Sequence, residues 1–471
     1  MINALLFSGI LLIISVLSSK LLYRFGIPTL LIFISLGMLL GSDGIGGIYF
    51  DNYEIAQQLS TLSLVFIMFY GGFGFNWKTG KPVAAQSILL ATFGVAITAF
   101  LVGAFATIIF KTSLMEGMLL GAVISSTDAA SVFSILRSKN LNLKGGLASM
   151  LEMESGSNDP MSYMLTIIVL AFMKSSGQIS VIELLSKQIF FGLAVGVAVS
   201  IAAVFVFNRV KISIEGLYPI FTIGIVLTGY ALSELLSGNG LLCVYVIGII
   251  MGNTTLIHKR SLVHFFDGMS WLLQIILFFT LGLLVFPSQL PPVFFEGFLV
   301  SIFLVLIARP IAVFSVLSWF KVPIKQQLLV SWVGLRGAAS IVFATYALTS
   351  NLPFANTIFN MVFFICLVSI LIQGTLIPFI AKKLDLVEQS VSVYKTFNDY
   401  QDEVYTKLIE YKIENDHPWA WKTIMEANIP EDILVVIIKR KKTVITPKGF
   451  TEIQPGDIMV LSSNNFESLP S

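Results

Sequence analysis

Charged side chains are scarce in this sequence of 471 residues. Aspartate, glutamate, lysine and arginine together make up 12% of it, whereas 56% of the residues are hydrophobic. This balance lies far outside the range of soluble domains and indicates a membrane protein. The formal net charge of +2 carries less information than the positions of the charges along the chain.

Residues and motifs that hold disulfides, metals or cofactors are also few. Cys243 and Cys366 lie in separate apolar runs, so both are interpreted as packing residues, and a disulfide framework is not indicated. The sequence contains no P-loop and no G-x-G-x-x-G fingerprint, and its three histidines do not suggest a metal site. We therefore expect no cofactor, no enzymatic activity, no ATP-driven pump and no nucleic-acid partner.

Long apolar runs are what the sequence does contain. Runs of about twenty residues recur, which is the length of a membrane-crossing helix. The fold class predicted is an all-α polytopic membrane protein in contact with lipid. About thirteen spans are expected, near 3–22, 27–42, 59–76, 83–109, 117–136, 147–173, 185–208, 216–236, 240–253, 268–286, 293–319, 326–349 and 357–381.

Lysine and arginine gather in alternate loops. They occur, for example, at 137–144, 209–211 and 321–325, whereas the intervening loops carry few of them. The positive-inside rule makes the basic loops cytoplasmic. An odd number of spans then predicts an N-terminus outside and a C-terminus inside the cell (inner) membrane.

Two predicted spans are interrupted by residues that are unsuited to a continuous apolar helix. Ser125-Ser126-Thr127-Asp128 interrupts the fifth, and Gly334-Leu335-Arg336-Gly337-Ala338 interrupts the twelfth. Unwound backbone at membrane depth requires protein or water around it. Such a pair predicts two broken crossing helices in inverted repeats, formed by spans four to six and eleven to thirteen.

The segment 152–160 places carboxylates inside an apolar run. A carboxylate at the bilayer centre costs about 2.5–3.5 kcal/mol, which favours a functional role. On a helix, Ser155 shares a face with Asp159, as Glu154 does with Asn158, and Pro160 frees a backbone carbonyl. This cluster of oxygens suits a dehydrated monovalent cation, although a cytoplasmic loop before a span is the alternative interpretation.

Asp159 is favoured as the carrier. Bound cation stabilises the ionised carboxylate, so proton and cation exclude each other from one site. With the neutral Asn158 beside a single titrating acid, one proton per monovalent cation is the simplest stoichiometry. An ion channel is the rival function, but the sequence offers neither a carbonyl filter motif nor rings of like charge.

The composition changes after the last predicted span. We expect a transmembrane domain at 1–385 and a small cytoplasmic α+β domain at 386–471. Strands are predicted at 433–438, 443–445 and 458–461, with proline-glycine turns between them.

The motifs at 127–128, 154–160 and 334–338 resemble the monovalent cation/proton antiporters of the NhaP type. The resemblance implies a homodimer in which a core domain moves like an elevator against a dimerisation domain. By residue, it implies that Asp159 binds the cation or the proton beside Asn158. It also implies an ion shell completed by Thr127, Asp128 and Ser155, and a structural ion pair between Glu154 and Arg336. Ala129 departs from members in which a proline follows the aspartate.

The tail resembles the C-terminal subdomain of regulators of potassium conductance, the TrkA-C domain, on the basis of the segment 454–458. This resemblance implies a regulatory domain, favours potassium over sodium, and suggests a cyclic dinucleotide or another nucleotide as regulatory ligand.

Four further residues have open or structural interpretations. Asp128 either ligates the ion through its side chain or compensates the helix ends at the break. Arg309 is interpreted as bonding freed carbonyls, and Glu234 and Asn239 as belonging to an outer loop.

Overall fold

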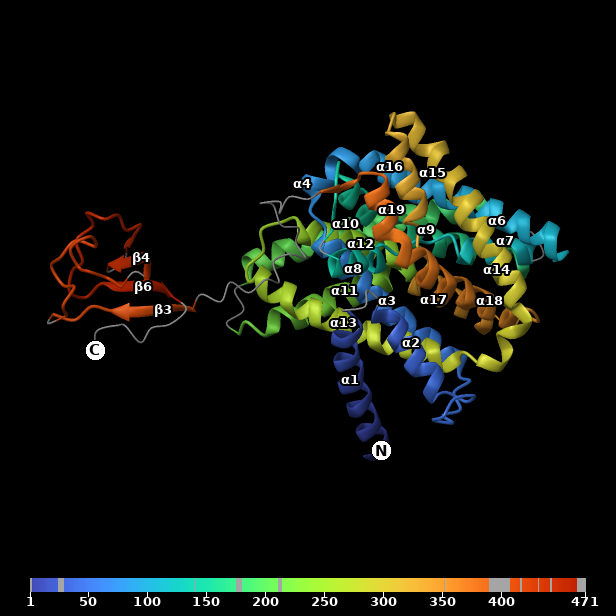
Figure 1. The fold of residues 1–471 in the computed structure, drawn as a ribbon, viewed down its shortest axis with the longest axis horizontal. Coiled ribbons are helices and arrows are strands. Elements are labelled where there is room, and N and C mark those ends of the chain that lie inside the picture. The colour runs from blue at the N-terminus through green and yellow to red at the C-terminus, as the bar shows by residue number, and fades with distance from the viewer. Residues whose placement is uncertain are drawn as a thin grey trace. The chain divides into compact units, whose positions relative to one another are not determined.

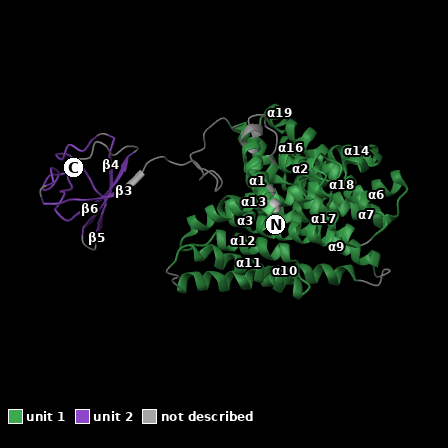
Figure 2. Ribbon diagram, turned by 90° about the horizontal axis from the view of Figure 1, so that it is seen from below, with its two compact units in different colours: residues 1–393 green, residues 394–471 purple. Residues whose placement is uncertain are grey.

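The chain forms two compact units, residues 1–393 and 394–471 (Figure 2). The computed structural model describes residues 2–23, 29–139, 141–174, 180–210, 214–350, 352–388, 407–415, 417–430, 432–440 and 443–463.

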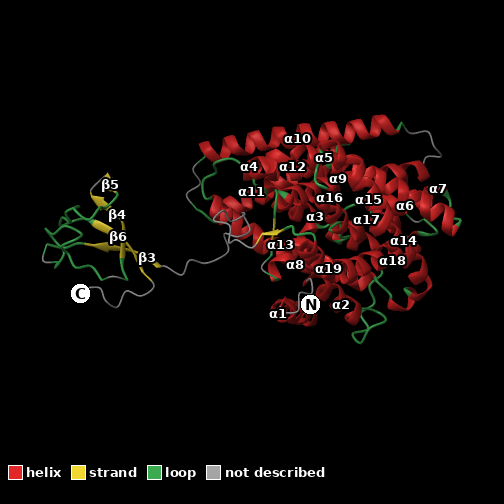
Figure 3. Cartoon of the chain, turned by 45° about the horizontal axis from the view of Figure 1, so that its top comes forward, coloured by secondary structure: helices red, strands yellow, loops and turns green. Residues whose placement is uncertain are grey.

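Unit 1 is built almost entirely of helices (Figures 1 and 3). The α-helices are α1 (Ile2–Tyr23), α2 (Thr29–Leu40), α3 (Tyr53–Gly74), α4 (Trp77–Gly80), α5 (Ala84–Leu89), α6 (Val95–Phe110), α7 (Leu114–Val123), α8 (Ala129–Ser138), α9 (Leu147–Lys174), α10 (Val181–Arg209), α11 (Leu217–Leu235), α12 (Gly240–Gly252), α13 (Lys259–Leu284), α14 (Phe294–Phe303), α15 (Arg309–Leu317), α16 (Ile324–Trp332), α17 (Ala338–Thr349), α18 (Ala355–Val368) and α19 (Thr375–Lys383). Short 3-10 turns are η1 (Lys81–Val83), η3 (Pro287–Gln289), η4 (Pro291–Val293) and η6 (Ser318–Phe320), and π turns are η2 (Leu90–Gly94), η5 (Leu304–Ala308) and η7 (Ser369–Gly374).

The helices have the lengths and composition of membrane spans, as predicted. Among the described residues, seven helical segments are long and apolar enough to cross a membrane: Tyr53–Gly74, Trp77–Phe110, Val181–Arg209, Leu217–Leu235, Lys259–Leu284, Pro287–Phe320 and Ala355–Lys383. Shorter apolar helices accompany them. The chain is therefore a multi-pass membrane protein, while the number of thirteen spans stays a prediction.

Both predicted helix breaks are present. The first lies between α7 and α8, and the second lies between α16 and α17. Each broken pair follows a segment of 34 residues, Trp77–Phe110 or Pro287–Phe320, and each such segment contains one π turn, η2 or η5. A further long helical segment follows each break. This repeated order of elements is the one expected for two structural repeats.

An apolar core holds the first broken pair against the second. Buried Ile135 and Leu136 of α8 pack in one cluster with Leu329 and Val330 of α16 and with Ile377 of α19. The long helix α10 instead exposes large apolar side chains, including Phe190, Ile201 and Phe205. Such a surface is suited to lipid.

A short β-ladder ties the end of α19 to the loop between α8 and α9. Strand β1 (Asn142–Leu143) pairs antiparallel with β2 (Val387–Glu388). The Lys144 backbone N–H donates to the Leu386 carbonyl at 2.9 Å, and Lys144 Nζ lies 3.1 Å from Asp385 Oδ1. The end of α19 and the strand β2 that follows it are therefore held by the loop between α8 and α9.

Unit 2 contains a four-stranded antiparallel sheet. Its strands are β3 (Lys407–Lys412), β4 (Leu434–Arg440), β5 (Thr443–Ile445) and β6 (Ile458–Ser463), in the spatial order β3-β6-β4-β5. Three of them were predicted. The strand β3 was missed, although the segment from Ile409 to Ile413 alternates apolar and polar residues as a half-buried strand does. The regular elements described within 407–463 are strands, so the described part of this small domain is β-rich.

Candidate ion-binding site

The two helix breaks cross within the packed interior of unit 1. At the crossing, the Asp128 backbone N–H donates to the Leu335 carbonyl at 2.8 Å. Arg336 and the residues around it are buried. Each unwound segment thus satisfies part of the other's backbone, which is the condition for breaking a helix at membrane depth.

Asp128 lies at the N-termini of both half-helices that leave the crossing. Its Oδ1 accepts from the Ser131 backbone N–H at 3.1 Å, and its Oδ2 accepts from Ser131 Oγ at 2.6 Å, so it caps α8. Gly337 is the N-cap of α17, and a Cβ at Gly337 would lie 2.2 Å from Asp128 Oδ2. An anion at two helix N-termini is electrostatically favourable. This geometry supports the interpretation in which Asp128 compensates the helix ends.

Arg336 lies at the opposite helix end of the crossing. Its Nη1 donates to the Ser125 carbonyl at 2.7 Å and to the Ser126 carbonyl at 2.6 Å. These carbonyls follow the C-terminus of α7, where a cation is favourable. The crossing therefore carries a negative group at its N-terminal helix ends and a positive group at a C-terminal one.

The predicted ion pair between Glu154 and Arg336 is wrong in its basic partner. Glu154 Oε1 lies 2.5 Å from Arg309 Nη2, and both side chains are nearly fully buried. Glu154 is on α9, whereas Arg309 begins α15, which packs beside α16. Arg309 therefore neutralises a buried carboxylate, instead of bonding freed carbonyls as predicted. Arg336 is engaged by the carbonyls at the end of α7.

The remaining predicted site residues meet where α9 passes the first break. Ser155 Oγ donates to the Thr127 carbonyl at 2.8 Å and accepts from the Ala129 backbone N–H at 3.0 Å. One turn further along α9, Asn158 Nδ2 donates to Thr127 Oγ1. Two segments of the predicted constellation, the first break and α9, are thus in contact.

Asp159 has a partner that the sequence prediction missed. Ser126 Oγ donates to Asp159 Oδ1. Asp159 is partly exposed, although its neighbours Asn158 and Pro160 are buried. The position of Ser126 within the polar interruption, two residues before Asp128, was the available signal for this contact.

Asn158 contributes an oxygen that is available for a ligand. The Oδ1 atom of Asn158 is buried and has no hydrogen-bond partner among the residues that the structure describes. A buried acceptor without a partner is costly, because it has lost its hydration. Asn158 therefore offers a buried oxygen that could coordinate a cation, one residue before Asp159 on α9.

Asn239 is a second residue that the sequence prediction missed. It was interpreted as part of an outer loop, but it is fully buried. Its Nδ2 donates to the Pro160 carbonyl at 2.9 Å, while its Oδ1 caps α12 by accepting from the Leu242 backbone N–H at 2.9 Å. Asn239 therefore fixes α12 against the proline-containing turn of α9, one residue after Asp159.

Comparisons with known proteins agree with this architecture. A family model described as sodium/hydrogen exchanger, transmembrane, matches residues 9–383, and a TrkA-C domain model matches residues 408–466. The K(+)/H(+) antiporter NhaP2 of Shewanella sp. (strain ANA-3) is 35% identical over 461 residues, which cover 96% of this chain and 80% of that protein. The K(+)/H(+) antiporter NhaP of Alkalimonas amylolytica is 35% identical over 427 residues, covering 90% and 74%.

A solved structure has the same fold. The sodium proton antiporter MjNhaP1 from Methanocaldococcus jannaschii, determined at pH 8, superposes with a TM-score of 0.72 at 22% sequence identity. The match covers 81% of this chain and 99% of that one.

Proposed function

The chain belongs to the sodium/hydrogen exchanger family, and from this premise we propose that it exchanges potassium for protons at a single site centred on Asp159. A member of this family is a cation/proton antiporter, and it is a secondary transporter rather than an enzyme. The observation that carries the proposal is that the partly exposed Asp159 and the buried Asn158 both bond to the first helix break, while Asn158 Oδ1 has no hydrogen-bond partner among the described residues.

Exchange follows from competition at this carboxylate. A bound cation favours the ionised form of Asp159, and a bound proton removes the charge that holds the cation. Each state therefore excludes the other, and the carrier crosses the membrane either with a cation or with a proton.

The surroundings of Asp159 support one proton per cation. Asn158 is neutral, the Glu154 carboxylate is held by Arg309, and the Asp128 carboxylate is held by the N-terminus of α8. Unlike Glu154 and Asp128, Asp159 has no ion pair with a cationic side chain and caps no helix in the part of the chain that the structure describes. One titrating group exchanging one monovalent charge gives electroneutral exchange by alternating access.

The shell around the ion is proposed from the same contacts. Asp159 and Asn158 supply side-chain oxygens, while Thr127 and Ser155 hold the unwound segment against α9. Asp128 does not coordinate the ion in this proposal, but its charge compensates the N-termini of the half-helices at the crossing. The broken helices would then move together with α9 as one core against the remaining helices.

Potassium is proposed as the cation because two relatives that span most of this chain are named K(+)/H(+) antiporters. Sodium is the second candidate, since the superposable neighbour is named a sodium proton antiporter. The residues 386–471 are proposed to regulate exchange by 1–385, through a nucleotide bound at the TrkA-C domain. A homodimer with its C-terminus in the cytoplasm completes the proposal.

The test is proton flux in proteoliposomes of the full chain. Outward gradients of potassium, sodium, rubidium and lithium are imposed in turn at several pH values. Proton uptake driven best by potassium, with a rate that does not change when a membrane potential is imposed, is the expected result. Flux that persists without a counter-moving cation, or that follows the membrane potential, would refute electroneutral antiport.

A further inference from the structure

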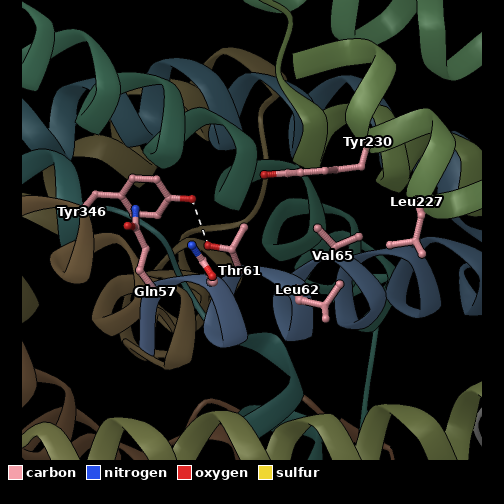
Figure 4. Close-up of a pocket in the computed structure, with 8 residues that line it drawn as sticks. Gln57, Thr61, Leu62, Val65, Leu227, Tyr230 and Tyr346 are labelled. Atoms are coloured by element: carbon pink, nitrogen blue, oxygen red, sulfur yellow. Dashed lines mark hydrogen bonds between the residues drawn. The ribbon is translucent and has the colours of Figure 1, made fainter. Parts of the chain in front are cut away.

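A cavity of about 370 Å³ lies between α3, α11 and α17. Gln57 and Thr61 line it from α3, Tyr230 lines it from α11, and Tyr346 lines it from α17 (Figure 4). The hydroxyl groups of Tyr230 and Tyr346 point toward the same space, and Thr61 Oγ1 and Tyr346 Oη are hydrogen-bonded at 3.0 Å (Figure 4). The wall therefore offers amide and hydroxyl oxygens together with aromatic rings.

Two aromatic rings, those of Tyr346 and Tyr163, lead from this cavity to α9, the helix that carries Asp159. The ring of Tyr346 packs against Tyr163, edge to face, with centroids 5.5 Å apart. Tyr163 also packs against Phe343 at 5.9 Å. Tyr163 lies four residues after Asp159 on α9, so both project from one helix face. Tyr346 thus lines the cavity and contacts Tyr163, which lies one helical turn after Asp159 on α9.

The cavity lies toward the face predicted to be outside. Its lining residues are near the N-terminus of α3 and the C-termini of α11 and α17. The chain at these ends, 41–52, 236–239 and 350–354, contains no lysine or arginine. Loops without basic residues are on the outer side by the positive-inside rule.

We infer that this cavity is the outer vestibule through which a partly hydrated alkali cation reaches Asp159, with Tyr163 and Tyr346 as its floor. Oxygens of Gln57, Thr61 and Tyr230 replace part of the water shell, and aromatic faces attract a cation at close range. The hydrogen bond between Thr61 and Tyr346 joins α3 to the second broken helix, so opening the floor requires these two elements to separate. The inference rests on the proposed role of Asp159 as carrier.

Site-specific labelling with a membrane-impermeant, charged thiol reagent tests the vestibule in the full chain. Val65 lines the cavity, whereas Leu64, its neighbour at the same depth of α3, does not. Both residues are buried, as are the natural Cys243 and Cys366. The variants are Val65→Cys and the matched control Leu64→Cys, with the parent chain as the background.

We expect Val65→Cys to react several-fold faster than Leu64→Cys when the reagent is outside, and exchange by the labelled protein to fall to background. Reaction from the cytoplasmic side alone, equal rates for the two variants, or full exchange after labelling would each overturn the vestibule. An unlabelled parent that does not exchange ions at all would instead refute the proposed function, and with it the role of the cavity. The two failures are therefore distinguishable.

Discussion

Glu154 Oε1 and Arg309 Nη2 lie 2.5 Å apart in the interior of the membrane unit, with 1% and 2% of their side chains exposed. The pair joins α9, which carries Asp159, to α15, and the Arg309 side chain also lies against Gly334 at the second helix break, where a Cβ would be 2.7 Å from Arg309 Nε. The ion pair thus connects the carrier helix, a neighbouring span and the crossing.

The first prediction concerns this pair. Glu154→Gln and Arg309→Gln should each lower the free energy of unfolding by about 3–5 kcal/mol, because each leaves one buried charge without its partner. The double variant should lose less than the sum of the two. A double-mutant cycle on thermal stability in detergent measures the coupling.

The exposed pair formed by Lys144 and Asp385 provides the control for that cycle. Single substitutions there should cost about 0–1 kcal/mol, since exposed ion pairs contribute little. Strictly additive losses at Glu154 and Arg309 would show that the two charges do not stabilise each other.

The second prediction concerns the crossing. Gly337→Ala should destabilise the protein by about 1–3 kcal/mol, the usual cost of overpacking, because its Cβ would overlap the Asp128 carboxylate. Exchange should fall along with stability. Gly71→Ala is the control, since a Cβ at that glycine of α3 meets no atom within 4 Å. Thermal melting and proton flux are measured together, and an unaffected Gly337→Ala would mean that Asp128 does not fill the gap between the half-helices.

The third prediction concerns the carrier. Asp159→Asn preserves the shape and the contact with Ser126, but it removes the group that exchanges a proton for a cation. Proton flux in proteoliposomes should fall to background, with normal membrane insertion. Asp43→Asn, a change at an exposed carboxylate outside this site, should leave flux close to the parent level. Parent-like turnover by Asp159→Asn would remove Asp159 from the mechanism.

The fourth prediction concerns the tail. A chain ending after Glu388 retains the β1–β2 ladder, so it should still exchange ions, with altered pH or ligand dependence. A chain ending after Leu384 also loses the buried Leu386, and it should be less stable by about 1.5–3 kcal/mol, the transfer free energy of such a side chain. Flux and melting temperature are measured for both. An inserted but inactive chain ending after Glu388 would make the tail part of the transport machinery.

The fifth prediction concerns pH and unit 2. Burial lowers the pKa of the His417 imidazole below its ordinary value of 6.5. Its Nδ1 accepts from the Trp419 backbone N–H at 3.2 Å, and its Nε2 lies 2.8 Å from Tyr411 Oη of β3. Protonating Nδ1 breaks the first of these bonds, so the folded state favours the neutral ring.

The direction of the effect follows from proton linkage. Between the lowered folded pKa and 6.5, the unfolded chain binds more protons, so stability rises with pH in that window. This contribution is complete above 6.5 and is lost as the pH falls through the folded pKa. Hydrogen exchange of the β3 amides, corrected for the intrinsic rate, should show less protection at acidic pH. The pH dependence should be absent from His417→Gln, and its persistence there would assign it to another group.

Part of the site follows from spacing along the chain. The polar and glycine-containing interruptions at 125–128 and 334–338 predicted the two helix breaks correctly, because unwound backbone needs such residues. Residues three or four apart share a helix face whatever surrounds the helix. Contacts of Ser155 and Asn158 with the first break could therefore be anticipated, given that α9 and the break lie at the same depth in the membrane. Short apolar runs bounded by turn residues likewise predicted β4 and β6.

The partner of Glu154 could not be found in this way. Arg309 and Arg336 are both arginines in apolar spans, and the sequence does not say which of them faces α9. That choice depends on how α9, α15 and the crossing pack. Arg336 does not pair with Glu154, because it donates instead to the carbonyls at the end of α7. The burial of Asn239 against Pro160 and the cavity between α3, α11 and α17 also depend on how the helices pack. The sequence alone therefore did not predict either feature. In a membrane protein both lipid-facing and protein-facing surfaces are apolar, so periodicity identifies the helices, whereas close packing alone decides which faces meet.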